Sequence, residues 1–270
     1  DTVSVGDLFA GALLPGLLLV GLYLAYTMIV SPSESEEAPG RLHRGESDSI
    51  DAKALATSLL PPLALIITVL GAILGGFATP TEAAGVGAFG AMLLALGYRT
   101  LDVDMLGEVC RATLKTTSMV FFILIGASLF SLVFRGYGGD EMVMSWFVDL
   151  PGGTWSALLL VLAVIFLLGF MLDFIEITFV VIPIVGPILL GMGIDPVWLG
   201  VLIAVNLQTS FLTPPFGFAL FYLRGVTPPE IPTTAIYRGV IPFIALQLLL
   251  LAILLAWPGL ATWLPEQLYD

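Results

Sequence analysis

Apolar runs of about 20 residues recur along this chain, and they restrict its fold more than any other feature. Residues 6–30, 55–77 and 236–264 are examples, each long enough to cross a bilayer. The chain is 58% hydrophobic and 11% charged, with a mean hydropathy of +1.04, whereas soluble proteins are roughly 45–50% hydrophobic and about 25% charged. In hydrocarbon an unsatisfied backbone group costs several kcal/mol, so spanning segments are expected to be helical. The composition excludes a soluble domain and predicts an all-α polytopic membrane protein of about seven or eight spans, or fewer spans plus re-entrant hairpins.

The net charge of −12 is concentrated in one polar stretch, residues 31–53. Between Glu34 and Asp51 acidic residues outnumber basic ones, which is typical of a solvated connector, and a surface suited to high salt is a second reading. So acidic a chain is not expected to bind nucleic acid. Cys110 is the single cysteine, so no intrachain disulfide can form. No basic leader precedes the first apolar run, which argues against a signal peptide.

Residues 206–217 combine a helix break with a cluster of polar side chains inside an apolar segment. Two adjacent prolines remove backbone donors and interrupt a helix, and the freed carbonyls need partners. A proline kink without a ligand is one reading. The other is a broken intramembrane helix whose oxygens coordinate a hard cation or a polar solute, as in secondary transporters. The candidate binding residues are Asn206, Gln208, Thr209, Ser210, Thr213, Pro214, Pro215 and Gly217, with Asn206 and Thr213 as candidate sodium ligands.

Asp173 and Glu176 stand between two apolar runs. Each acid at the centre of a spanning helix costs roughly 2.5–3.5 kcal/mol, and a three-residue spacing places the pair on one helix face. Such acids persist if they face a cavity, an ion or a polar partner, or if they lie at the membrane interface. Both readings stay open here. An intramembrane protease is disfavoured because no second aspartate occurs in a comparable apolar context.

Residues 99–115 predict an interfacial amphipathic helix, because charged residues alternate there with leucine and methionine. Its basic residues make this connection cytoplasmic by the positive-inside rule. The apolar residues 116–134 predict either a plain span or a re-entrant hairpin that turns near Gly126 and includes Ser128.

Residues 79–84 predict a helix start, with Thr81 as the N-cap and Glu82 at the positive end of the helix dipole. The helix that follows carries Gly85, Gly87 and Gly90, which permit close packing against another helix in lipid.

Taken together, these motifs resemble the large membrane subunit of tripartite ATP-independent periplasmic (TRAP) transporters. The resemblance covers essentially every segment. The sequence of residues 121–134 and 206–225 is most similar to the branch labelled mannitol/chloroaromatic. The matching motifs are residues 3–7 with Pro15-Gly16, residues 77–84, residues 169–176 with Asp173, residues 193–196 and residues 206–217.

The resemblance implies an elevator-type carrier of the ion-transporter superfamily, built from inverted repeats with re-entrant hairpins and broken helices, in the bacterial inner membrane. It implies sodium-coupled uptake of an organic acid delivered by a periplasmic binding protein, with a small four-helix membrane subunit as partner and sodium as the only cofactor. Residues 206–217 would be the ion-site loop of the second repeat, and Asp173 its acidic neighbour. The family's first repeat precedes the segment that begins this chain, so the chain would hold part of the substrate site and need the missing N-terminal half to transport.

The resulting segments are 1–30 (transmembrane helix), 31–53 (acidic loop), 54–98 (transmembrane helices), 99–115 (arm helix), 116–223 (transport-domain hairpin and broken helices) and 224–270 (final transmembrane helix). Three alternatives remain. A proton-coupled carrier would use Asp173 and Glu176 as proton carriers. A non-transporting membrane scaffold would need no polar break in mid-membrane. An intramembrane enzyme would need a catalytic constellation that the sequence does not display, so no enzymatic activity is predicted.

Overall fold

The computed structural model describes residues 4–30, 52–148, 150–213, 218–228 and 231–269, and these ranges are helical with no β-strand. Six of the helices are long and apolar enough to cross a membrane, and two shorter apolar helices, Gly153–Leu168 and Pro196–Leu212, accompany them. The prediction of an all-α polytopic membrane protein is therefore confirmed. In chain order the elements are α1 (Val5–Val30), α2 (Ala52–Leu74), α3 (Pro80–Gly97), α4 (Val103–Gly136), α5 (Gly139–Val148), α6 (Gly153–Leu168), α7 (Phe174–Glu176), the π-helix η2 (Ile177–Val181), α8 (Ile182–Gly191), α9 (Pro196–Leu212), α10 (Phe218–Val226), α11 (Thr233–Ala256) and α12 (Gly259–Tyr269).

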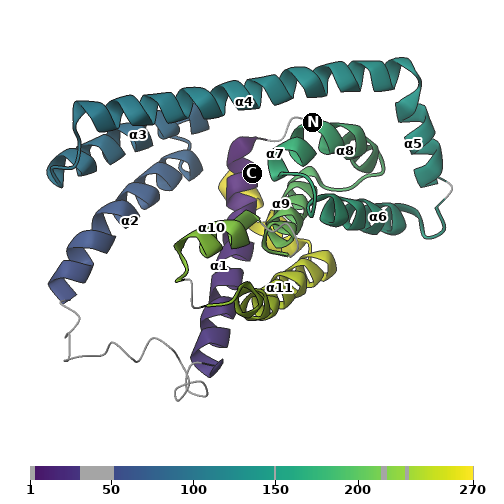
Figure 1. The fold of residues 1–270 in the computed structure, drawn as a ribbon. Helices are drawn as coiled ribbons and strands as arrows, with labels where there is room; N and C mark the ends of the chain where they lie inside the picture. Colours follow the sequence, from purple (N-terminus) through teal and green to yellow (C-terminus); the bar gives the residue numbers. More distant parts are fainter. Residues whose placement is uncertain (1–3, 31–51, 149, 214–217, 229–230, 270) are drawn as a thin grey trace.

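Helix α9 is the centre of the bundle, with α1, α6, α10, α11 and α12 packed around it (Figure 1). Its Leu202 is fully buried, as are Ile165 of α6 and Leu254 of α11. Glycine permits close contact between α1 and α9: a Cβ on Gly11 of α1 would lie 2.7 Å from Cγ1 of Val197. The polar end of α9 is therefore held inside a packed core.

Helices α2 and α3 pack on each other and lie to one side of this bundle (Figure 1). A Cβ on Gly90 would lie 2.4 Å from Cδ1 of Leu65, and one on Gly87 would lie 3.2 Å from Cγ2 of Val69. The prediction of close packing is confirmed at these two glycines, whereas Gly85 has no described neighbour within 4 Å of such a Cβ.

Helix α3 begins with a reciprocal capping box formed by Thr79 and Glu82. The Thr79 hydroxyl accepts a bond from the Glu82 backbone, and the Glu82 carboxylate accepts one from the Thr79 backbone at 2.8 Å. The prediction of Thr81 as N-cap is therefore wrong by two residues. Pro80 takes the first helical position, where its missing N–H costs nothing, so the cap falls on the residue before it.

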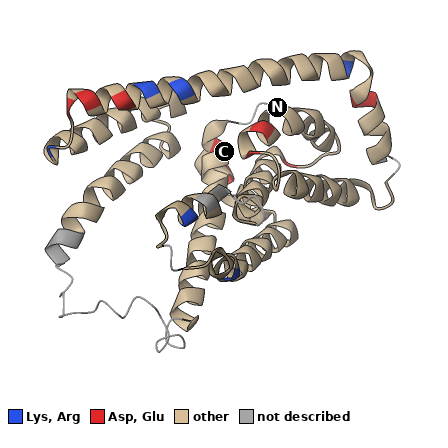
Figure 2. Ribbon diagram, viewed as in Figure 1, with Lys and Arg blue, Asp and Glu red and all other residues tan. Residues whose placement is uncertain are grey.

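Helix α4 runs without a break for 34 residues, through both Lys115 and Gly126. Of the two readings for residues 116–134, the re-entrant hairpin that turns near Gly126 is wrong and the helix without a turn is found, because a helical glycine costs only about 1 kcal/mol. The chain turns instead at Gly138, whose φ of 73° favours glycine. At roughly 1.5 Å per residue, α4 is longer than the ~30 Å hydrocarbon layer is thick. Its charged residues gather on the first half and at the far end (Figure 2). Because the helix is continuous, the predicted arm helix and the apolar segment that follows it are two parts of one long helix.

The last predicted span, residues 236–264, is two helices in the structure, which corrects the single final helix of residues 224–270. Helix α11 ends at Ala256, and Trp257 leaves helical geometry with φ −136° and ψ 82°. Pro258 follows and disfavours helical geometry at the residue before it. Helix α12 then packs along α1.

Candidate functional site

The polar end of α9 is buried in the bundle, with Asn206, Thr209 and Ser210 at most 1% exposed. Each hydroxyl in this turn donates its proton to a backbone carbonyl four residues earlier: Thr209 to Val205 at 2.8 Å, Ser210 to Asn206 at 3.0 Å and Thr213 to Thr209 at 2.7 Å. A hydroxyl whose proton is engaged in this way keeps its lone pairs for accepting. The last turn of α9 therefore presents neutral oxygen acceptors.

Helix α9 ends at this turn, as the sequence predicts. Its last residue is Leu212, and Thr213 is extended, with φ −90° and ψ 128°. The next helix, α10, begins at Phe218, so the predicted break between them is confirmed. Pro214, Pro215 and Gly217 lie outside the described residues.

The polar turn is held directly against the end of α6. The Asn206 side-chain amide donates a buried bond of 2.8 Å to the carbonyl of Leu162. Further along, a Cβ on Gly169 would lie 2.3 Å from Oγ of Ser210, which leaves no room for a side chain. Gly169 is the C-cap of α6, so the two helices meet where both end.

Asp173 follows this contact as the N-cap of α7, with its carboxylate accepting from the Phe174 backbone at 2.7 Å. Its φ of −70° and ψ of 154° are extended, so Asp173 stands outside the helix and only Glu176 lies within it. The prediction that both acids share one helix face is therefore corrected. Both side chains are half-buried. The rings of Phe174 and Phe211, 6.4 Å apart and edge to face, link this segment to α9.

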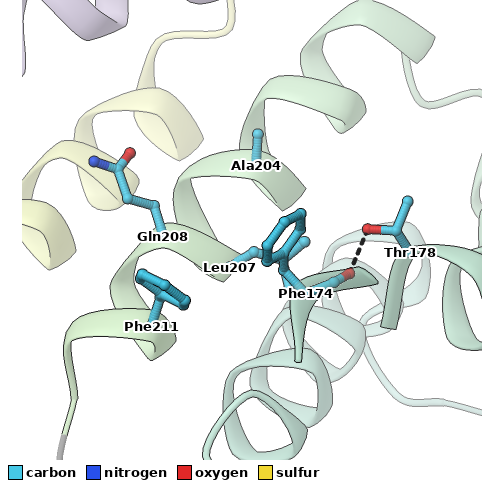
Figure 3. A pocket seen from close by; sticks show the side chains of 6 residues that line it. All are labelled: Phe174, Thr178, Ala204, Leu207, Gln208 and Phe211. Carbon is cyan, nitrogen blue, oxygen red and sulfur yellow. Dashed lines mark hydrogen bonds between the residues drawn. The ribbon is translucent and has the colours of Figure 1, made fainter. Parts of the chain in front are cut away.

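A cavity of about 380 Å³ opens between α9 and the segment formed by α7 and η2 (Figure 3). It is mostly apolar, and its polar groups are the Gln208 amide and the Thr178 hydroxyl, which donates to the Phe174 carbonyl at 2.7 Å. The wall opposite α9 includes the π-helix η2, in which the Ile182 backbone N–H donates to the carbonyl of Ile177, five residues earlier. Single π-helical turns of this kind are frequent at functional sites. The lining residues are Phe174, Thr178, Ala204, Leu207, Gln208 and Phe211.

Of the predicted site residues that the structure describes, Gln208 alone is among those that line this cavity. Gly126 lies inside α4, where no described atom comes within 4 Å of an added Cβ. Ser128 donates to the Leu124 carbonyl at 2.8 Å and faces a second cavity, on the α4 side of η2. Sequence reasoning missed Thr178 and Phe174, since a π-turn has no distinctive local signature, although Phe174 directly follows Asp173.

Charged metal ligands do not gather in the described part of the chain: no group of three or more His, Cys, Asp or Glu side chains there could hold a metal ion. The oxygens at the end of α9 are hydroxyl, amide and carbonyl groups. Such neutral oxygens suit an alkali cation rather than a transition metal.

Comparisons with known proteins agree with this architecture. The family model described as "Tripartite ATP-independent periplasmic transporter, DctM component" matches residues 1–260. The chain is 32% identical over 266 residues to the C4-dicarboxylate TRAP transporter large permease protein DctM of Pseudomonas aeruginosa, covering 98% of this chain and 61% of that protein. It is 29% identical to the sialic acid TRAP transporter large permease protein SiaM of Vibrio cholerae (98% and 61%), and 26% identical to the ectoine TRAP transporter large permease protein TeaC of Halomonas elongata (97% and 60%). The chain thus spans about six-tenths of the length of these relatives.

Proposed function

Because this chain belongs to the DctM family of tripartite ATP-independent periplasmic transporter components, we propose that it forms part of a carrier that takes up an organic acid together with sodium. Members of the family are permease subunits of the inner membrane and not enzymes, and the apolar helices make this chain a multi-pass protein of that membrane. The assignment to a mannitol/chloroaromatic-like branch stays a prediction.

The observation that carries the proposal is the buried polar turn at the end of α9. Asn206, Thr209 and Ser210 are buried in an otherwise apolar bundle, and α9 breaks immediately after them. Each of these side chains donates a proton to a backbone carbonyl, which offsets the cost of burial and leaves the side-chain oxygens as acceptors. A dehydrated sodium ion at the break would receive oxygen ligands from this turn, including Asn206 and Thr213.

The substrate class is proposed from the relatives. Their names specify C4-dicarboxylates, sialic acid and ectoine, all of which carry a carboxylate group. We propose that this chain also handles an organic acid, delivered by a periplasmic binding protein. A small four-helix membrane subunit and the remainder of the large permease would complete the transporter, in which the bundle around α9 moves as an elevator.

A proton-coupled carrier is the second candidate, and the half-buried carboxylates of Asp173 and Glu176 favour it. These acids flank the cavity wall that begins at Phe174. Proton coupling would make uptake follow a pH gradient without sodium, whereas the leading proposal requires sodium at constant pH.

Uptake by the assembled transporter in proteoliposomes, measured against external sodium, tests the proposal. Thr213→Val removes one oxygen at the break and should raise the sodium concentration for half-maximal uptake by roughly tenfold, about 1.4 kcal/mol. Thr68→Val is the matched control, because the Thr68 hydroxyl also donates to a carbonyl four residues earlier, at 2.7 Å, but lies on α2. Unchanged sodium dependence in a folded Thr213→Val variant would contradict the sodium site.

A further inference from the structure

A second cavity of about 410 Å³ lies between α4 and the segment formed by η2 and α8. Thr178 of η2 lines the first cavity and the next residue, Phe179, lines the second, so the π-helix is a wall of both. The described lining of the second cavity consists of Leu124, Ala127, Ser128, Ser131, Leu132, Arg135, Phe179 and Pro183.

This cavity differs from the first in its charge. Arg135 is the one charged residue among the described residues that line it, and the first cavity has no charged residue among those that line it. Ser128, Ser131 and Arg135 are spaced by three and four residues along α4, so they form one stripe on the same helix face. One cation and two hydroxyls therefore converge on an otherwise apolar space.

The guanidinium of Arg135 is oriented by Asp140 of α5. Nε of Arg135 lies 3.2 Å from Oδ2 of Asp140, in an ion pair whose side chains are 56% and 46% exposed. A guanidinium has five N–H donors in a planar fork, and this contact engages the Nε edge. The remaining donors can bind a second anion bidentately, as arginine does with carboxylates.

We propose that this second cavity binds the acid group of the transported solute, with Arg135 and the hydroxyl of Ser131 as donors and the solute's carbon skeleton against Phe179, Leu124 and Pro183. The inference rests on the proposed function and adds the place where the organic anion is recognised. It puts the anion on the α4 side of η2, and the cation on the α9 side. The π-helix then lines the cavity on each side, so a shift of this helix on binding the anion would also change the surroundings of the cation.

Cysteine protection in the assembled transporter tests this placement. Leu132→Cys in a Cys110→Ser background puts the thiol in the second cavity without removing a proposed donor, and Ala204→Cys in the same background puts it in the first. The rate of alkylation by N-ethylmaleimide is measured with succinate, N-acetylneuraminate, ectoine or benzoate, and with dimethyl succinate as a neutral control. At least one carboxylate should slow alkylation of Leu132→Cys by threefold or more, while dimethyl succinate does not and Ala204→Cys stays unprotected.

Adding Arg135→Gln should abolish that protection, and Arg135→Lys should restore part of it, because the positive charge returns without the fork. The proposal is overturned if none of the four carboxylates protects Leu132→Cys, if the neutral ester protects equally, or if protection survives Arg135→Gln. Because the measurement needs no transport, protection of the thiol can still be observed if the Thr213→Val experiment rejects the sodium site. Conversely, sodium-dependent uptake without protection would reject this cavity and retain the proposed function.

Discussion

The backbone of Gly169 lies against the side chain of Ser210, so closely that a Cβ on Gly169 would be 2.4 Å from Cβ of Ser210 and 2.3 Å from its Oγ. Gly169 ends α6, and Ser210 lies in the last polar turn of α9. Because the segment bearing Asp173 follows Gly169 by only a few residues, this contact sets where the acid stands relative to the break.

Gly169→Ala should therefore push α6 away from α9 and lower both stability and uptake. Overpacking of this kind costs about 1–3 kcal/mol, which is measurable as a lower melting temperature in detergent. Gly21→Ala on α1 is the control, since no described atom lies within 4 Å of a Cβ there, and it should leave the melting temperature equal or higher. A Gly169→Ala protein as stable and active as the parent would show that the contact is not needed.

Asp173 has two separable roles, a cap for α7 and a charge beside the cavity wall. Asp173→Asn keeps a capping oxygen and removes the charge, so stability should stay within about 0.5 kcal/mol while coupled uptake falls at least about tenfold. Asp173→Ala should also lose about 0.5–2 kcal/mol of stability with the cap. Thermal melting and initial uptake rates distinguish these effects. Normal uptake by Asp173→Asn would restrict the residue to capping.

Gln247 of α11 is fully buried, and neither polar atom of its side chain has a hydrogen-bond partner in the described structure. The hydroxyl of Tyr23 on α1 is likewise buried without a hydrogen bond of standard geometry, although it lies close enough to the Gln247 side chain to interact with it. An unsatisfied buried amide costs about 1–3 kcal/mol, so Gln247→Leu should raise stability by about 1 kcal/mol. Gln267→Leu, at an exposed position of α12, is the control. A lower melting temperature for Gln247→Leu would mean that the amide is bonded in the protein, to the Tyr23 hydroxyl or through a buried water.

Cys110 reports the orientation of α4, because it is exposed in the first, charged half of that helix. The basic residues Arg99, Arg111 and Lys115 predict a cytoplasmic position for this half. A membrane-impermeant maleimide should label Cys110 in inside-out vesicles and leave it unlabelled in intact cells, with Cys110→Ser as the blank. Labelling in intact cells would reverse the predicted topology.

Local chemistry made several elements predictable from the sequence. The residues from Val5 to Val30 form a helix because an apolar run of that length has no other way to satisfy its backbone in lipid. The break after Leu212 was readable because two prolines remove backbone donors. The start of α3 was placed within two residues, since capping depends on side chains only three positions apart.

The hairpin reading at Gly126 and the expectation of a single last helix were wrong for the same reason. A glycine or proline destabilises the interior of a helix by about 1–3 kcal/mol, and tertiary packing decides whether the helix continues through it. Helix α4 runs through Gly126, and α2 runs through Pro61 and Pro62, whereas the chain breaks at Trp257 before Pro258.

The sequence by itself determined that the chain is a multi-span helical membrane protein with a polar break after Leu212, because hydrophobic length and backbone hydrogen bonding act along the chain. Only the tertiary structure decided that Gly169 meets Ser210, that Ser128 faces a different cavity from Gln208, and that the π-helix forms a wall of both cavities. These relations join residues on helices that are not consecutive in the sequence, and they depend on how helices pack, which no local pattern encodes.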